Sequence, residues 1–140
     1  LSQTWADTGM EAHRATTVVG FPNLFILLGP NTGLGHNSVM LMAEAQVDYI
    51  LQAIQYLDRA GSGSVEPLAQ AQTRWNAELQ KRARGTVWVD GGCASWYLDR
   101  GRNTTVWPDF TFAFQRELRR FQQTEFLTVA REPNPSMVSQ

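Results

Sequence analysis

Apolar residues divide the first half of the chain into two segments of different periodicity. The almost continuous run LFILL at 24–28 is typical of a strand buried on both faces, and it predicts a strand over 23–28 after a turn at 20–22. From 37 to 58, apolar residues recur every three or four positions, which predicts a helix of five to six turns ending before Gly61. Its apolar stripe comprises Val39, Ala43, Val47, Ile50, Ile54 and Leu57.

The second half of the chain gives weaker signals. GSGS at 61–64 predicts a flexible joint, and Pro67 suits the first turn of a second helix that Gly85 ends. The apolar positions of that helix are Leu68, Ala71, Trp75 and Leu79. TVWV at 86–89 predicts a short strand, and we expect one brief extended piece near 104–107. A short last helix is expected within 110–126, whereas residues 1–17 read as a turn-rich lead-in.

Composition narrows the class of protein. The 140 residues suffice for one domain, and the net charge of −1 gives no reason to expect a nucleic-acid or membrane-surface partner. No apolar stretch approaches the ~20 residues that span a bilayer, and the start does not resemble a signal peptide. A single cysteine, Cys93, fits a reducing compartment, and we expect a cytoplasmic protein. With two histidines and one cysteine, the sequence has no zinc-site spacing, and we predict no metal site.

The loop between the predicted strand and the long helix carries the strongest chemical signal. Gly29, Gly33 and Gly35 permit close backbone approaches, and the N–H groups at the start of the helix, near 36–38, favour an anion. The loop matches neither the dinucleotide fingerprint nor the phosphate loop. Three interpretations stay open from the residues alone: a cofactor loop, a structural turn capped by Asn37 or Ser38, and a Ser38–His36 hydrolytic pair without its orienting acid.

Two longer blocks add a family resemblance. GFPNLFILLGPNTGLGHNSVMLMAEAQVDYI and GGCASWYLDRGRNTTVWPDFT resemble, in this order, the C-terminal half of flavin-dependent monooxygenases of the Baeyer–Villiger type, over roughly residues 5–121. The resemblance implies an α/β fold, with residues 1–140 forming one C-terminal fragment of a Rossmann-like FAD-binding flavoprotein. Residues 18–60 would be the last strand, loop and helix of the FAD-binding domain, 61–125 a helical and loop region, and 126–140 a disordered tail.

The resemblance also implies which residues bind cofactors, while it assigns no catalytic residue to this chain. The flavin ring would lie beside a loop of seven residues, namely Asn31, Thr32, Gly33, Leu34, Gly35, His36 and Asn37. Trp96 would fold over the nicotinamide cofactor, and Asn103 would belong to the bend that follows. Interior packing is an equal alternative for Trp96 and the favoured one for Trp88. Arg102 has two open roles, a phosphate contact and a solvated surface arginine.

The implied activity needs parts that this sequence lacks. Relatives use FAD, NADPH and O2 to insert one oxygen atom beside a ketone or to oxidise sulfur or nitrogen in a small organic molecule. Because no glycine fingerprint occurs here, the other cofactor sites would lie in upstream domains, and the fragment alone should be inactive and prone to self-association. The alternative is a non-catalytic dimerisation module derived from a flavoprotein. The family also reads Glu-Ala-Tyr and then a glycine where this chain has Glu11, Ala12, His13, Arg14 and Ala15.

Overall fold

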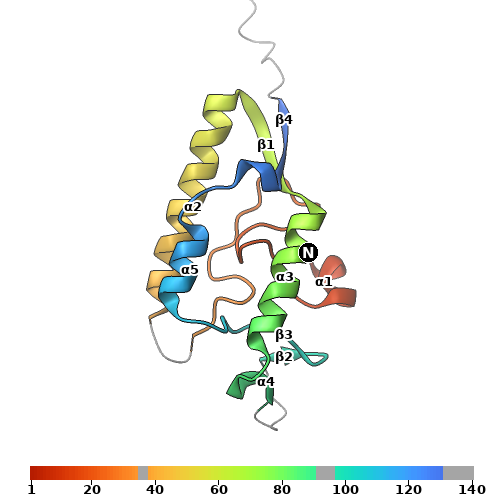
Figure 1. Cartoon of the computed structure of the whole chain (residues 1–140). Coiled ribbons are helices and arrows are strands. Elements are labelled where there is room, and N and C mark those ends of the chain that lie inside the picture. Colours follow the sequence, from red (N-terminus) through yellow and green to blue (C-terminus); the bar gives the residue numbers. More distant parts are fainter. Residues whose placement is uncertain (35–37, 91–96, 131–140) are drawn as a thin grey trace, which may run out of the picture.

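Three helices form the framework of the computed structural model, which describes residues 1–34, 38–90 and 97–130 (Figure 1). The principal helices are α2 (Val39–Ala60), α3 (Ala69–Ala83) and α5 (Thr111–Leu118). Shorter helical pieces are α1 (Ser2–Thr8), α4 (Val87–Asp90) and the 3-10 turn η1 (Gln123–Glu125). The strands are β1 (Ser62–Pro67), β2 (Leu98–Asp99), β3 (Arg102–Asn103) and β4 (Phe126–Ala130).

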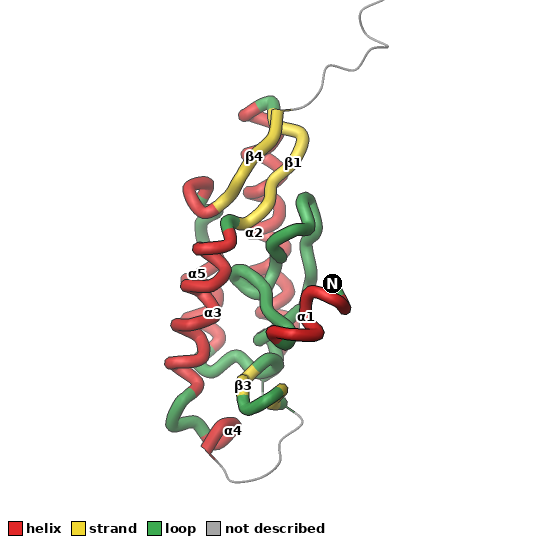
Figure 2. Tube along the Cα trace, turned by 90° about the vertical axis from the view of Figure 1, so that its right-hand side faces the viewer, coloured by secondary structure: helices red, strands yellow, loops and turns green. Residues whose placement is uncertain are grey.

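The two small sheets lie at opposite ends of the molecule. β1 pairs antiparallel with β4 at one end, beyond the start of α3, and β2 pairs antiparallel with β3 at the other end, beside α4 (Figures 1 and 2). α2 and α5 lie side by side, and the N-terminal loops run between α2 and α3 (Figure 1). No helix in the described ranges is long and apolar enough to cross a membrane.

The ends of α2 have local causes. The hydroxyl of Ser38 accepts a hydrogen bond from the backbone N–H of Met40 at 3.3 Å, which satisfies one of the donors that a helix start leaves free. Gly61 closes the helix in the left-handed conformation, with φ 61° and ψ 24°. The helix predicted over 37–58 is therefore confirmed, with its observed limits at 39 and 60.

Aromatic rings make up much of the core. Trp107 stacks on Trp75 at 6.1 Å between ring centroids and meets Phe114 edge-on at 5.1 Å. Phe121 continues the contacts, at 4.5 Å from Phe126 and 5.5 Å from Tyr49. These rings connect α3, α5, β4 and α2, so burial of large aromatic surfaces holds together segments that are distant in the sequence.

The apolar stripe that the sequence indicates on α2 is not the face that the described structure buries. The buried residues of this helix are Met42, Gln46, Tyr49 and Ala53, whereas Val39, Val47 and Ile54 are exposed. An apolar stripe normally faces the core. The helix therefore carries apolar side chains on two faces, and only one of them is covered here.

The strand predicted over 23–28 is wrong in this structure. Residues 21–28 form turns, with one isolated bridge between Phe25 and Thr17, and Leu27 and Leu28 are exposed. Asn23 and Leu28 have φ of 58° and 52°, outside the strand region. Continuous apolar character indicated burial on both faces, but no neighbouring strand lies beside this segment within the described residues.

The flexible joint expected at 61–64 is also wrong, because these residues enter β1. The strand carries a bulge between Ser62 and Ser64 and pairs with β4 up to Pro67 and Phe126. The disordered tail expected over 126–140 is therefore wrong at its start, where Phe126–Ala130 form β4. Residues 131–140 lie outside the described residues.

Other local predictions have mixed outcomes. The mixed α/β class, the second helix and the short last helix are confirmed. The strand predicted at 86–89 is wrong, since Val87–Asp90 form a helical turn, and the lead-in contains α1. The extended piece expected at 104–107 is reduced to an isolated parallel bridge between Gly33 and Val106. That bridge brings the glycine loop into contact with the second sequence block.

Candidate functional site

The glycine loop is held against residues 103–107 by backbone hydrogen bonds. The N–H of Asn31 donates to the carbonyl of Thr104 at 3.0 Å, and the N–H of Gly33 donates to that of Thr105 at 2.8 Å. In return, the N–H of Trp107 donates to the carbonyl of Gly33 at 2.9 Å. The two sequence blocks that carry the family resemblance thus form one local structure, although Asn31 and Asn103 are 72 positions apart in the sequence.

Asn31 strengthens this contact with its side chain. Its backbone is left-handed, with φ 59°, which asparagine tolerates better than most residues. The amide Nδ2 donates to the carbonyl of Asn103 at 2.8 Å, in a site where only 2% of the residue is exposed. Because both residues are buried, this bond replaces hydrogen bonds that water would otherwise make to the amide.

Asn103 serves the same structure from the other side. Its Nδ2 donates to the carbonyl of Val106 at 2.7 Å, while its Oδ1 accepts from the N–H groups of Val106 at 3.0 Å and Thr105 at 3.3 Å. Gln80 on α3 brackets the backbone of Asn103, since its side chain accepts from the Asn103 N–H and donates to the Asn103 carbonyl. The side chain of Asn103 thus shapes the turn at 103–106, and a cofactor contact by this residue remains a prediction.

The residue types at positions 32 and 33 of the loop have local causes. The Thr32 hydroxyl donates to the carbonyl of Gly29 at 2.6 Å, which closes the turn. A Cβ added to Gly33 would lie 2.9 Å from the carbonyl oxygen of Thr105, which belongs to the backbone and has no flexible side chain to move aside. Glycine at 33 is therefore required by packing within this chain.

We expect Gly33→Val to separate the loop from residues 104–106 and to lower the free energy of unfolding by about 1–3 kcal/mol, the usual cost of overpacking. The matched control is Gly61→Asn at the end of α2, where nothing lies within 4 Å and asparagine accepts the left-handed backbone. Urea unfolding followed by circular dichroism measures both. Equal stabilities of the two variants would contradict the packing argument.

A hollow of about 280 Å³ opens beside this loop at the start of α2. The loop contributes Leu34, α2 contributes Val39, and Trp88 and Tyr97 contribute aromatic rings in edge-to-face contact at 5.2 Å. Gly33, Thr105 and Val106 complete the lining. The packing role favoured for Trp88 agrees with its half-buried ring. No cationic side chain lines the hollow among the described residues.

This chemistry suits one end of a flavin. Apolar and aromatic walls accept a flat ring, and the N–H groups at the start of α2 favour its electron-rich edge. The described lining of the hollow contains no cationic side chain, so it offers no charged partner for a pyrophosphate. Within the part of the chain that the structure describes, no cluster of ligands could hold a metal ion. The residues that line the hollow therefore fit a flat aromatic ring system.

Four of the predicted cofactor-binding residues, Gly35, His36, Asn37 and Trp96, lie outside the described residues. Arg102, for which the sequence left two roles open, makes contacts within the chain. Its guanidinium forms an ion pair with Glu11 and donates to the carbonyl of Thr8 at 2.9 Å. Arg102 thus fastens β3 to the N-terminal segment.

A buried ionic cluster near β4 was missed by the sequence reasoning. Glu125 accepts hydrogen bonds from His13 Nε2 at 3.0 Å and from Arg14 Nε at 2.9 Å, and only 1% of His13 is exposed. Arg14 also donates to the carbonyl of Glu117, and its guanidinium lies 5.4 Å from the centre of the Trp75 ring. The only sequence signal was the departure at 13–15 from the family pattern.

Burial and charge set the protonation of this cluster. Burial lowers the pKa of His13 to about 4, against the opposing influence of the Glu125 carboxylate. Burial alone would raise the pKa of Glu125, but the hydrogen bond and charge of Arg14, followed by those of His13, outweigh it and hold that pKa below its ordinary value. At neutral pH the cluster therefore consists of a neutral imidazole, a guanidinium and a carboxylate.

Comparison with known proteins gives consistent matches. A Baeyer–Villiger monooxygenase of Streptomyces coelicolor is 45% identical over 140 residues, covering 99% of this chain and 26% of the relative. One of Pseudomonas aeruginosa is 46% identical over 128 residues, covering 90% of this chain and 24% of the relative. No protein-family model matches. The chain thus spans about a quarter of the length of these curated relatives.

Solved structures agree in fold. An oxidised steroid monooxygenase bound to NADP superposes with a TM-score of 0.78 at 26% identity, over 93% of this chain and 25% of that protein. A complex of the monooxygenase OTEMO with FAD and NADP gives a TM-score of 0.73 at 22% identity, over 92% of this chain and 24% of that one.

The fold of this chain therefore matches one segment, about a quarter in length, of each of these two monooxygenases. By sequence, the chain is homologous to about a quarter of a Baeyer–Villiger monooxygenase.

Proposed function

We propose that this chain is part of a cytoplasmic, FAD- and NADPH-dependent monooxygenase that inserts one oxygen atom from O2 next to the carbonyl group of a small organic ketone. Oxidation of sulfur or nitrogen centres is a second activity within this proposal. The identity to the two bacterial relatives supports the reaction class. Alone, the chain should be inactive, because most contacts of both cofactors would come from the remaining polypeptide.

The observation that carries the proposal is the pairing of the loop at 31–34 with residues 103–107. These hydrogen bonds fix Gly33 and Leu34 at one side of the hollow, and Val39, the first residue of α2, also lines it. When bound, FAD would supply the reaction with O2. The start of α2 would then stabilise negative charge at the ring edge by about 1 kcal/mol, or somewhat more in a dry site.

The other residues would serve position and water exclusion. Backbone at Gly33 and the side chain of Leu34 would lie along the ring, and Trp88 and Tyr97 would keep water out of the hollow. Asn31, Thr32 and Asn103 would act by holding the loop, through the hydrogen bonds described above. Gly35, His36 and Asn37 are proposed to continue the flavin contact, and Trp96 to cover the nicotinamide cofactor.

A hybrid enzyme tests the proposed function. In the Streptomyces coelicolor relative, this chain replaces the segment aligned with it, and flavin absorbance, NADPH consumption and oxygenated products are measured with cyclohexanone and methyl phenyl sulfide. We expect the hybrid to retain FAD and to form lactone, and the 140-residue chain alone to purify without flavin. Gly33→Val in the hybrid should reduce FAD content, and Gly61→Asn should not.

Two results would count against this proposal. A hybrid that folds but binds no FAD would show that the loop does not complete a flavin site. Stoichiometric, tightly bound FAD in the isolated chain would show that the pyrophosphate grip lies within these 140 residues. The non-catalytic alternative, a dimerisation module, is favoured by the exposed apolar face of α2, and it predicts a folded hybrid without turnover.

A further inference from the structure

Large apolar side chains gather on the outer surface of α2 and the loop beside it. Met40 is 63% exposed and Leu51 49%, values that are unusual for methionine and leucine in a folded domain. Seven of the exposed large hydrophobic residues belong to this surface, which we call the α2 face: Leu27, Leu28, Val39, Met40, Val47, Leu51 and Ile54.

Helical geometry places four of these residues in one stripe. Successive residues of an α-helix turn by about 100°, so Met40, Val47, Leu51 and Ile54 lie within roughly 60° of one another. Met42, Gln46, Tyr49 and Ala53, which are buried, point to the opposite side. The stripe therefore runs along most of the helix and faces away from the core.

The loop at 26–28 carries two more residues of the α2 face, Leu27 and Leu28. Gln46 holds this loop, since its side chain accepts from the N–H of Leu28 at 2.9 Å and donates to the carbonyl of Ile26 at 3.2 Å. Gln46 is fully buried and also donates to the carbonyl of Ala15 at 2.7 Å. Leu27 and Leu28 are thus exposed on a loop that hydrogen bonds fix to the helix, and their exposure follows from that fixed position.

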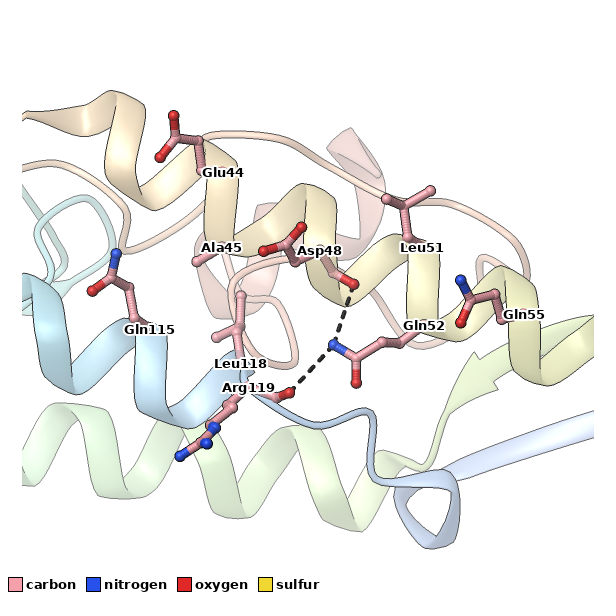
Figure 3. Close-up of a pocket in the computed structure, with 9 residues that line it drawn as sticks. All are labelled: Glu44, Ala45, Asp48, Leu51, Gln52, Gln55, Gln115, Leu118 and Arg119. Carbon is pink, nitrogen blue, oxygen red and sulfur yellow. Dashed lines mark hydrogen bonds between the residues drawn. The ribbon is translucent and has the colours of Figure 1, made fainter.

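A polar groove of about 480 Å³ borders the stripe on the side of α5 (Figure 3). Glu44 and Asp48, one helical turn apart, line it from α2, and Gln115 on α5 and Arg119 just past the end of α5 line its other side. Gln52 crosses the groove and donates to the carbonyls of Asp48 and Arg119 (Figure 3). Among the described residues, neither carboxylate has an ion-pair partner.

We propose that the α2 face is the docking surface for the remainder of the monooxygenase, through a segment that is apolar on one side and carries lysine or arginine along one edge. This inference rests on the proposed function. The chain covers about a quarter of its relatives' length, so a large partner surface within the same enzyme is available to cover it. The basic edge would meet Glu44 and Asp48, while the apolar side would cover Met40, Val47, Leu51 and Ile54.

Thiol labelling of the hybrid enzyme tests this docking. Leu51→Cys and the control Ala77→Cys, an exposed site on α3, are made with Cys93→Ser in both the isolated chain and the hybrid. Maleimide labelling rates are measured at several protein concentrations. In the dilute isolated chain both thiols should react at similar rates. In the hybrid the thiol at 51 should react at least about tenfold more slowly, and the thiol at 77 should not change.

Charge substitution gives a second readout. Leu51→Lys should lower the yield of soluble hybrid severalfold, whereas Ala77→Lys should leave it unchanged. The proposed docking is overturned if the thiol at position 51 reacts with maleimide equally fast in the isolated chain and in the hybrid enzyme. It is also overturned if the hybrid with the wild-type sequence of this chain does not form a folded, soluble enzyme. It is also overturned if the thiol is protected in the isolated chain at every concentration, because a second copy would then be the occupant. FAD content reports separately on the proposed function: a protected thiol without flavin supports docking alone.

Discussion

Replacing Glu125 with alanine is expected to lower the free energy of unfolding by about 2–4 kcal/mol, because two buried donors lose their acceptor while Arg14 keeps the carboxylate of Glu117 at 3.8 Å. Glu125 accepts hydrogen bonds from both Arg14 and His13, whose side chains are almost completely buried. Without the carboxylate, the guanidinium of Arg14 would retain its charge in a site walled by Trp75. Urea unfolding followed by tryptophan fluorescence at pH 7.5 measures the loss.

The matched control is Glu78→Ala on α3. Glu78 also pairs with basic side chains, Lys81 and Arg82, but at an exposed position, so its loss should cost less than about 1 kcal/mol. If the variants at 78 and 125 unfolded at the same urea concentration, the buried cluster would contribute no more than a surface ion pair.

Acidification should destabilise the chain through His13. Its folded pKa of about 4 is below the ordinary value of 6.5, so the unfolded chain binds a proton first as the pH falls. The contribution of His13 to the free energy of unfolding is therefore fully present above pH 6.5, and it is lost as the pH falls from 6.5 to 4. The loss should reach roughly 2–3 kcal/mol at pH 4.5, at 1.36 kcal/mol per pKa unit. Glu125, whose pKa is lowered, loses its contribution only at still lower pH.

His13→Gln isolates this effect, because glutamine can donate to Glu125 but does not titrate. Unfolding curves for both proteins at pH 7.5 and pH 4.5 give the comparison, and His36 is present in both. The variant should lose roughly 2–3 kcal/mol less than the wild type on acidification. The same pH dependence in both proteins would place the titrating group elsewhere.

Elements whose hydrogen bonds are local were predictable from the sequence. α2 follows from apolar spacing and from Gly61 just past its end, and α3 follows from apolar spacing, signals that lie within a few residues of each helix. Pro67, which the sequence placed in the first turn of α3, is the last residue of β1 instead. β1 and β4 were not predictable, because each strand exists only through its partner some 60 residues away. The outer face of α2 was misassigned for a related reason: periodicity shows that a helix has an apolar stripe, and it does not show what the stripe packs against.

In the candidate site, too, local features could be predicted from the sequence and contacts between distant residues could not. Glycines and the following helix start marked the loop at 29–34, since their conformational roles can be read locally. The pairing of Asn31 with Asn103 spans 72 positions and that of His13 with Glu125 spans 112, and single-sequence reasoning has no signal for such contacts. For Asn103 the family resemblance implied a cofactor contact, which stays a prediction, whereas the hydrogen bonds by which its side chain shapes the turn at 103–106 became clear only from the structure.

The reciprocal bonds between the loop at 31–34 and the turn at 103–107 also bear on how such enzymes can be recombined. Each side supplies backbone donors or acceptors to the other, and a Cβ at position 33 would lie only 2.9 Å from the carbonyl oxygen of Thr105. A crossover point anywhere between residues 34 and 103 would join two halves selected in different backgrounds. When genes of this family are recombined, we therefore expect the folded products to carry both segments from the same parent.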